Sequence, residues 1–183
     1  MAVIRDAGRG AAVSVREARK PDHPAIRDLL TAAYQEYESA LPPGGLEYYL
    51  GDLLDLDGRA GTGQLLVAEL QDRIAGTVTF FRDAAVEGLG WPHGWAGLRA
   101  LGVDPALRGR GIGRRLIREC RDRARLLGVP VLCLHTAAFM TAAVAMYEAM
   151  GFQRAPAYDF DPRDLYESEL TESITVIGYT LDL

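Results

Sequence analysis

The sequence has few of the residues that build disulfides, metal sites or membrane spans. Its 183 residues include two cysteines and three histidines, and all five are scattered. Their spacing matches no metal site, so we expect no bound metal. Cys120 and Cys133 lie in apolar patterns, which predicts buried, reduced thiols of the kind found in the cytoplasm. No run approaches the ~18 apolar residues of a membrane span.

Lysine is almost absent, and the positive charge is concentrated in one segment. One lysine stands beside nineteen arginines, which we attribute to composition bias. The net charge of -5 argues against a nucleic-acid binder, because such proteins are normally basic. Eight arginines fall within 108–125, and those from Arg118 onward fit a solvated helix face. Arg5 and Arg9 accompany no adequate apolar stretch, so no signal peptide is expected and the protein should be cytoplasmic.

The length and the apolar fraction of 49% predict one domain with a substantial core. Residues 1–12 are rich in Gly, Ala and Arg and are expected to form a disordered tail, with the single domain at 13–183. We find no internal repeat and no linker.

Hydrophobic periodicity predicts an alternation of strands and helices. Strands are expected at 13–18, 64–70, 74–82, 95–103, 131–135, 152–158 and 173–183. Helices are expected from the Pro21–Pro24 segment to before Pro42, and at 46–56, 112–127 and 141–150. Loops should run through Gly58, Gly61 and Gly63, and through 83–94. The helix at 112–127 should bury Ile112, Leu116, Ile117, Cys120, Ala124 and Leu127, with Gly128 as its cap. This order is typical of a mixed α/β domain.

A glycine-rich segment joins an apolar strand to the arginine-studded helix, and it predicts an anion site. The segment reads Arg108-Gly109-Arg110-Gly111-Ile112-Gly113 and is followed by Arg114. Glycines allow positive φ, and the first amides of a helix lack internal partners and carry partial positive charge. The segment lacks the lysine and hydroxyl of a Walker loop and the third glycine of a dinucleotide fingerprint.

The segment, with Leu101-Gly102-Val103-Asp104-Pro105 before it, resembles the acyl-CoA pyrophosphate loop of the GNAT acetyltransferases. Ala143-Val144-Ala145-Met146-Tyr147-Glu148-Ala149-Met150-Gly151-Phe152 resembles a second motif of that family, Ala-x-x-x-Tyr-x-x-x-Gly-Phe. The resemblance implies a mixed α/β GNAT fold. Its mostly antiparallel sheet would have about seven strands, splayed between the fourth and fifth, with about four flanking helices. It also implies an N-acetyltransferase that uses acetyl-CoA as co-substrate and needs no metal.

The resemblance also assigns site residues. The pyrophosphate would be held by Arg108, Gly109, Arg110, Gly111, Ile112, Gly113 and Arg114, and a Cβ at Gly111 or Gly113 would push the phosphates away. The pantetheine arm would pair with the backbone of Leu101, Gly102 and Val103, and an amide at or next to Leu101 would polarise the thioester carbonyl. Tyr147 would be the general acid that protonates the departing thiolate.

Two departures from the family pattern leave the proton acceptor and one contact open. The fourth strand reads Ala96-Gly97-Leu98-Arg99, with no glutamate to serve as base. Glu36, Glu38, Glu87, Asp159 and His135 are the candidates, and an amine that arrives neutral would need no base. Met140 stands where many relatives carry an asparagine that contacts the pantetheine arm.

The acceptor is expected to be a primary amine of a small molecule, an amino acid derivative or a peptide. Its site would be built from residues 34–57, 83–95 and 158–172, whose acidic and aromatic side chains favour a cation or simply form a solvated surface. Trp91 and Trp95 would line this cleft or pack over a core edge. No nucleic acid or membrane partner is expected, and many relatives dimerise, although no interface stripe is visible here. The competing hypotheses are a catalytically idle acyl-CoA sensor and an unrelated phosphate- or nucleotide-binding protein.

Overall fold

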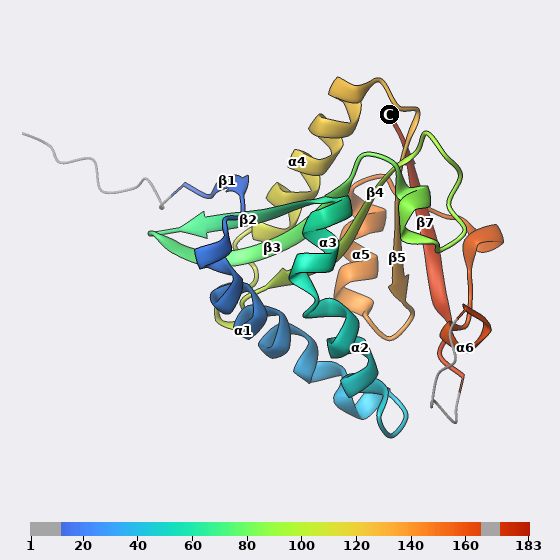
Figure 1. The fold of residues 1–183 in the computed structure, drawn as a ribbon, viewed down its shortest axis with the longest axis horizontal. Coiled ribbons are helices and arrows are strands. Elements are labelled where there is room, and N and C mark those ends of the chain that lie inside the picture. The colour runs from blue at the N-terminus through green and yellow to red at the C-terminus, as the bar shows by residue number, and fades with distance from the viewer. Residues whose placement is uncertain (1–11, 166–172) are drawn as a thin grey trace, which may run out of the picture.

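The computed structural model describes residues 12–165 and 173–183 (Figure 1). The strands in this part are β1 (Ser14–Glu17), β2 (Gln64–Leu70), β3 (Arg73–Phe81), β4 (Ala96–Val103), β5 (Val131–Ala137), β6 (Gln153–Arg154) and β7 (Val176–Asp182). The α-helices are α1 (His23–Tyr34), α2 (Gly45–Leu53), α3 (Leu56–Thr62), α4 (Ile112–Leu127), α5 (Thr141–Ala149) and α6 (Pro162–Leu165). None of these helices is long and apolar enough to cross a membrane.

The strands form one seven-stranded sheet in the order β1-β2-β3-β4-β5-β7-β6. β4 and β5 are parallel, and the other neighbouring strands are antiparallel. The register of β4 with β5 runs only from Ala96↔Leu132 to Leu98↔Leu134. Beyond Leu98 the two strands part, and we call this opening the splay. The predicted mixed α/β fold, with its mostly antiparallel sheet opened between β4 and β5, is confirmed.

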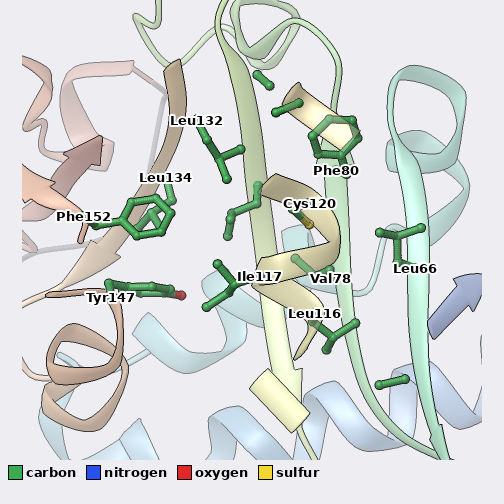
Figure 2. Packing of buried hydrophobic residues seen from close by; sticks show 14 of the residues in the cluster. Leu66, Val78, Phe80, Leu116, Ile117, Cys120, Leu132, Leu134, Tyr147 and Phe152 are labelled. Atoms are coloured by element: carbon green, nitrogen blue, oxygen red, sulfur yellow. The ribbon is translucent and has the colours of Figure 1, made fainter. Parts of the chain in front are cut away.

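Helices cover both faces of the sheet, as the alternation along β2 shows. Leu65 and Val67 pack against α1 and α3, whereas Leu66 and Ala68 belong to the main core with α4 and α5. Successive side chains of a strand point to opposite faces, so α1 and α3 lie on one face and α4 and α5 on the other (Figure 1). Figure 2 shows the main core, where Leu116, Ile117 and Cys120 of α4 meet side chains of the strands.

β4 carries a bulge next to the splay. Thr77 pairs with Gly102 and Thr79 with Arg99, so two residues of β4 lie opposite Val78. One of them, Ala100, has a φ of +53°. Alanine rarely adopts this conformation, and such strain persists where the surrounding structure enforces it, often at functional sites. The bulge therefore marks the part of β4 that lacks a β5 partner.

The structure confirms α4 and β2 at their predicted bounds and most other elements to within a few residues. The helix expected to reach Pro42 is α-helical only as far as Tyr34 and continues as the 3₁₀ helix Gln35–Ala40. Five of the six residues predicted on the apolar face of α4 are buried, but Leu127 is exposed, so that expectation was wrong. Both cysteines are buried and free. The predicted tail falls almost entirely outside the described residues, as does 166–172 of the predicted acceptor segment.

Two element predictions are wrong. The expected helix at 46–56 is two helices, and the expected loop through Gly58 and Gly61 is α3. Asp55 caps α3 by accepting a hydrogen bond from Gly58 N, which restarts the helix after Leu54. The expected strand at 152–158 is reduced to Gln153–Arg154, because Pro156 begins a short 3₁₀ helix and cannot donate to a ladder. Four longer helices match the expected number, and α3 and α6 are additional.

Candidate active site

The glycine-rich segment forms a tight loop that leaves amides at the start of α4 without side-chain partners. Gly109 and Gly111 both have a φ of +76°, which favours glycine. Gly111 is the N-cap residue, and no side chain accepts a hydrogen bond from the first turn of α4. The helix begins at Ile112 with its amides directed outward, and no acidic residue lies in that turn. Such an end is suited to bind a phosphate.

The arginines around this loop differ in how they are held. The Arg108 guanidinium pairs with the Glu36 carboxylate and donates to the Ala33 carbonyl at 3.2 Å, which ties the loop to α1. Arg114 lines a cavity that begins at this loop, whereas the Arg110 side chain is exposed and does not line it. Arg114 is therefore the best placed of the three for an anion at the loop, and Arg108 first has to leave or share its carboxylate partner.

Gly113 is constrained by packing between helices. A Cβ there would lie 3.2 Å from Met146 Sδ and 3.4 Å from its Cε, both on α5. By contrast, a Cβ at Gly111 meets no protein atom within 4 Å. The small residue at 113 thus lets α4 approach α5, while the glycine at 111 serves the loop conformation.

A cavity of about 530 Å³ runs from this loop along β4 to α5, and we call it the smaller cavity. It collects nearly all the residues that the sequence assigns to the site: Leu101, Gly102, Val103, Arg108, Gly109, Gly111, Ile112, Gly113, Arg114 and Tyr147. Arg110 is the one exception. The loop, the unpaired edge of β4 and the tyrosine therefore share one continuous space, although they come from separate segments. Bare amides at one end and an open strand edge along the side fit an extended molecule with a diphosphate.

Tyr147 lies in α5 on the main-core face of the sheet. Only 5% of the residue is exposed, and its ring meets Phe152 edge-on, with 5.8 Å between the ring centroids. Figure 2 shows the ring projecting towards Ile117, with the hydroxyl pointing away from the helix that carries it. Burial raises the pKa of the phenol well above its ordinary value. Tyr147 therefore keeps its proton at neutral pH.

A second cavity of about 920 Å³ lies on the α1–α3 face, and we call it the larger cavity. The two cavities have seven lining residues in common: Tyr34, Leu98, Arg99, Ala100, His135, Thr136 and Met140. Most of these lie where β4 and β5 part. All three segments expected to form the acceptor site contribute to its wall, among them Tyr48, Tyr49, Asp52, Glu87, Trp91 and Phe160.

Four of the five candidate bases are poorly suited to accept a proton from a molecule in the larger cavity. Glu36 and Asp159 pair with Arg108 and Arg154, and hydrogen bonds from these guanidinium groups lower the pKa of each carboxyl. Glu38 is exposed and lines neither cavity. His135 lines both, but burial lowers its pKa to about 4. Its Nε2 is 2.9 Å from the Tyr158 carbonyl, which makes Nε2–H the donor in the neutral ring.

Glu87 differs from the other four. It lines the larger cavity, and its side chain is only 4% exposed. Burial raises the pKa of this carboxyl to about 7. The sequence named Glu87 only as one of five, because the burial arises from the packing of the 83–95 segment over β4 and β5.

The two tryptophans have different positions. Trp91 is buried, lines the larger cavity and stacks on His135 with 4.4 Å between the ring centroids. Trp95 packs against the buried cluster that contains Trp91 and does not line the larger cavity. The cleft interpretation thus fits Trp91, and the core-edge interpretation fits Trp95.

The sequence missed Arg99 as a site residue. This β4 side chain donates to Asp52 Oδ2 at 2.6 Å and lies 3.7 Å from Glu87 Oε2, which places a cation among the acids of the larger cavity. In the sequence, the only indication of such a role was that Arg99 follows Gly97 by two residues, which puts both on the same face of the strand. In the described part of the chain no group of three His, Cys, Asp or Glu side chains could hold a metal ion.

Comparison with known proteins gives one family. The model of the acetyltransferase (GNAT) family matches residues 23–152. The chain is 35% identical over 133 residues to an IAA acetyltransferase of Azospirillum brasilense, covering 66% of this chain and 82% of that protein. It is 49% identical over 57 residues to the N-alpha-acetyltransferase RimI of Mycobacterium tuberculosis, covering 31% and 34%. The structure of the putative acetyltransferase YncA from Salmonella typhimurium, solved with its cofactor acetyl-CoA, superimposes with a TM-score of 0.63 at 19% identity, covering 94% and 95%.

Proposed function

Because this chain belongs to the acetyltransferase (GNAT) family, we propose that it moves an acetyl group from acetyl-CoA directly to a primary amine. The acceptor is a small molecule, an amino acid derivative or a peptide, and residues 13–183 form the single catalytic domain. The observation that carries the proposal is the smaller cavity, which joins the bare amides of the α4 loop to the buried Tyr147.

The loop and β4 hold the two ends of the coenzyme. The amides from Gly109 to Gly113 donate to the diphosphate, and Arg114 adds a charge-assisted hydrogen bond. The unpaired edge of β4 at Leu101–Val103 offers backbone donors and acceptors to the pantetheine arm. Tyr34 Oη already donates to the Leu101 carbonyl at 3.3 Å, so this contact fixes the strand edge from the α1 side.

Acetyl-CoA, when bound, supplies an acyl carbon activated as a thioester. The amide at or next to Leu101, freed by the bulge, stabilises negative charge on the carbonyl oxygen, and such a donor contributes about 3–4 kcal/mol. Tyr147 Oη donates its proton to the leaving sulfur. Burial raises the pKa of this phenol, so Tyr147 keeps its proton until a thiolate forms beside it.

The larger cavity is the acceptor site in this proposal. Asp52, Glu47 and Glu87 line it beside Arg99, which favours a cationic group, and aromatic rings line the same wall. A relative that carries the name N-alpha-acetyltransferase supports a peptide α-amine as one acceptor class.

An acyl-CoA sensor without catalysis is the second candidate, because β4 carries no acid between Ala96 and Val103. Thiol release separates the two functions. Purified protein is incubated with acetyl-CoA and a panel of alkyl, aromatic and peptide amines at pH 7.5, and free thiol is measured. We expect release that depends on the amine, with an acetylated product visible by mass spectrometry. Binding of acetyl-CoA without release on any amine would favour the sensor.

A further inference from the structure

The β4 position that lacks a side chain is covered by a carboxylate from another segment. A Cβ on Gly97 would lie 3.2 Å from Glu87 Oε1 and 2.9 Å from the Cβ of Ala84. Gly97 and Arg99 lie on the same face of β4, because side chains alternate along a strand. The glycine thus leaves room for Glu87 directly over the strand, one residue before Leu98, where the pairing with β5 ends.

The turn that carries Glu87 is fixed to the sheet. Glu87 ends the 3₁₀ helix Ala84–Glu87, whose first turn is capped by the Asp83 side chain accepting from Ala85 N. Ala84 is fully buried, and its amide donates to the Trp95 carbonyl at 2.7 Å. Gly88, with a φ of +68°, ends the turn. The backbone that carries the Glu87 side chain is therefore anchored to the sheet.

The surroundings of Glu87 do not satisfy its carboxylate. Among the described residues no donor reaches the buried Oε2 atom within hydrogen-bond distance. Arg99 is 3.7 Å away and gives its short hydrogen bond to Asp52 instead. A buried carboxylate without full hydrogen bonding costs stability, so its presence in a cavity wall indicates a use for it.

Glu87 and Tyr147 approach the splay from opposite faces of the sheet. Glu87 lines the larger cavity on the α1–α3 face, and Tyr147 lines the smaller cavity and belongs to the core on the α4–α5 face. The residues common to both cavities include Leu98, Arg99 and Ala100 of β4. A nitrogen that arrives from one face and a sulfur that leaves towards the other would meet where β4 and β5 part.

We propose that Glu87 is the general base of this enzyme, and that it takes a proton from the acceptor's ammonium group directly or through one water. The assignment rests on the proposed N-acetyltransferase function. The nitrogen then forms a bond to the acetyl carbon while the carbon–sulfur bond breaks. The sulfur takes the Tyr147 proton, and the second proton lost by the nitrogen restores the phenol. Glu87 releases its proton to water, so an ammonium and a thioester give an amide, a thiol and one proton.

The charges facing Glu87 support this role. Burial has the largest effect and disfavours the carboxylate, Arg99 on β4 and Arg59 on α3 favour it, and Asp52 on α2 disfavours it, so the pKa is raised to about 7. Cys133 on β5 also faces this charge, and burial keeps its thiol neutral. A base works best with a pKa near the operating pH.

The test is the pH dependence of kcat/KM for Glu87→Gln. The parent, Glu87→Gln and the control Glu119→Gln are assayed between pH 5.5 and 9 with the best amine of the panel. Glu119 pairs with Arg123 on α4 and lies outside both cavities. We expect the parent to rise with pH and level off above about 7, as its base loses its proton. Glu87→Gln should lose about 100-fold at pH 7.5 and keep rising as the neutral amine accumulates. Glu119→Gln should follow the parent.

Glu87→Ala separates lost chemistry from lost structure. Added formate should restore part of kcat in this variant and none in Tyr147→Phe, because a small carboxylate replaces only the missing base. Acetyl-CoA should raise the melting temperature of all variants as it does for the parent.

A parent-like profile in Glu87→Gln, or no response of Glu87→Ala to formate, would overturn the assignment while leaving the proposed function intact. A parent that binds acetyl-CoA but releases no thiol on any amine would overturn the proposed function itself, and the assignment with it.

Discussion

Among single residues, Tyr147 and Glu87 are both groups whose acid–base behaviour is set by removal from water. Burial disfavours the charged form of each, so both pKa values are raised. The consequences differ, because the phenol thereby stays protonated at every physiological pH whereas the carboxyl titrates near pH 7. Tyr147 is therefore suited to donate a proton, and Glu87 is suited to take up and release a proton near neutral pH.

Replacing Tyr147 with Phe removes the proposed proton donor and keeps the ring that packs against Phe152. We expect kcat to fall about 100-fold, as for the loss of a general acid, with the KM for acetyl-CoA little changed. Steady-state thiol release measures both constants. An unchanged kcat would refute the assignment of Tyr147 as the acid.

Replacing Glu87 with Gln should stabilise the protein at neutral pH. The folded-state pKa of about 7 exceeds the ordinary value of 4.5, so the parent loses stability as pH rises between these values. The loss is on the order of 3 kcal/mol and is complete above pH 7. Urea unfolding should therefore give equal stabilities at pH 4.5 and a Glu87→Gln advantage that grows up to pH 7. A constant difference across this range would contradict a buried, titrating Glu87.

At the scale of elements, the start of α4 combines a required backbone conformation with free amides. Gly111 and Gly128 flank the same helix, both have positive φ, and a Cβ on either meets no protein atom within 4 Å. Gly111 and Gly128 therefore form a matched pair for substitution. An alanine would be similarly strained at either position, and only Gly111 belongs to the proposed coenzyme site.

We expect Gly111→Ala and Gly128→Ala to lose similar stability, roughly 1–2 kcal/mol each. Only Gly111→Ala should weaken acetyl-CoA binding, at least 10-fold, because the loop amides turn away from the diphosphate. Isothermal titration with acetyl-CoA measures the difference. Equal affinity in both variants would remove the loop from the coenzyme site.

The elements also show what sequence patterns can and cannot predict. The bounds of α4 follow from local signals, namely apolar residues at helical spacing and Gly128 as cap. The break between α2 and α3 does not, because it depends on Asp55 capping Gly58 and on Arg59 donating to the carbonyls of Asp52 and Leu53. Glycines at 58 and 61 suggested a loop, and these contacts override their low helix propensity.

For the whole molecule, the sheet places two cavities on opposite sides of one opening between parallel strands. The residues of the proposed coenzyme side could be named from the sequence, because a backbone site needs glycines at fixed spacing, which leaves a motif. The proposed acceptor side could be named only as three segments, since the walls of the larger cavity come from residues far apart in the chain and no spacing rule connects them. Glu87 over Gly97 is a product of that long-range packing.

Ligand binding should be visible in the stability of the whole domain. Acetyl-CoA and CoA at 100 times their Kd should each add about 2.7 kcal/mol. For a domain of this size that corresponds to a rise in melting temperature of roughly 5–10 °C. ATP lacks the pantetheine arm and should give little or no rise. A shift with ATP equal to that with CoA would indicate a nucleotide site instead.

A crystal structure with acetyl-CoA would show whether the coenzyme lies between the α4 loop and Tyr147. We expect the diphosphate on the amides between Gly109 and Gly113, the pantetheine arm along Leu101–Val103, and the sulfur within hydrogen-bond reach of Tyr147 Oη. A diphosphate bound away from this loop, or a thioester remote from the opening between β4 and β5, would contradict this expectation.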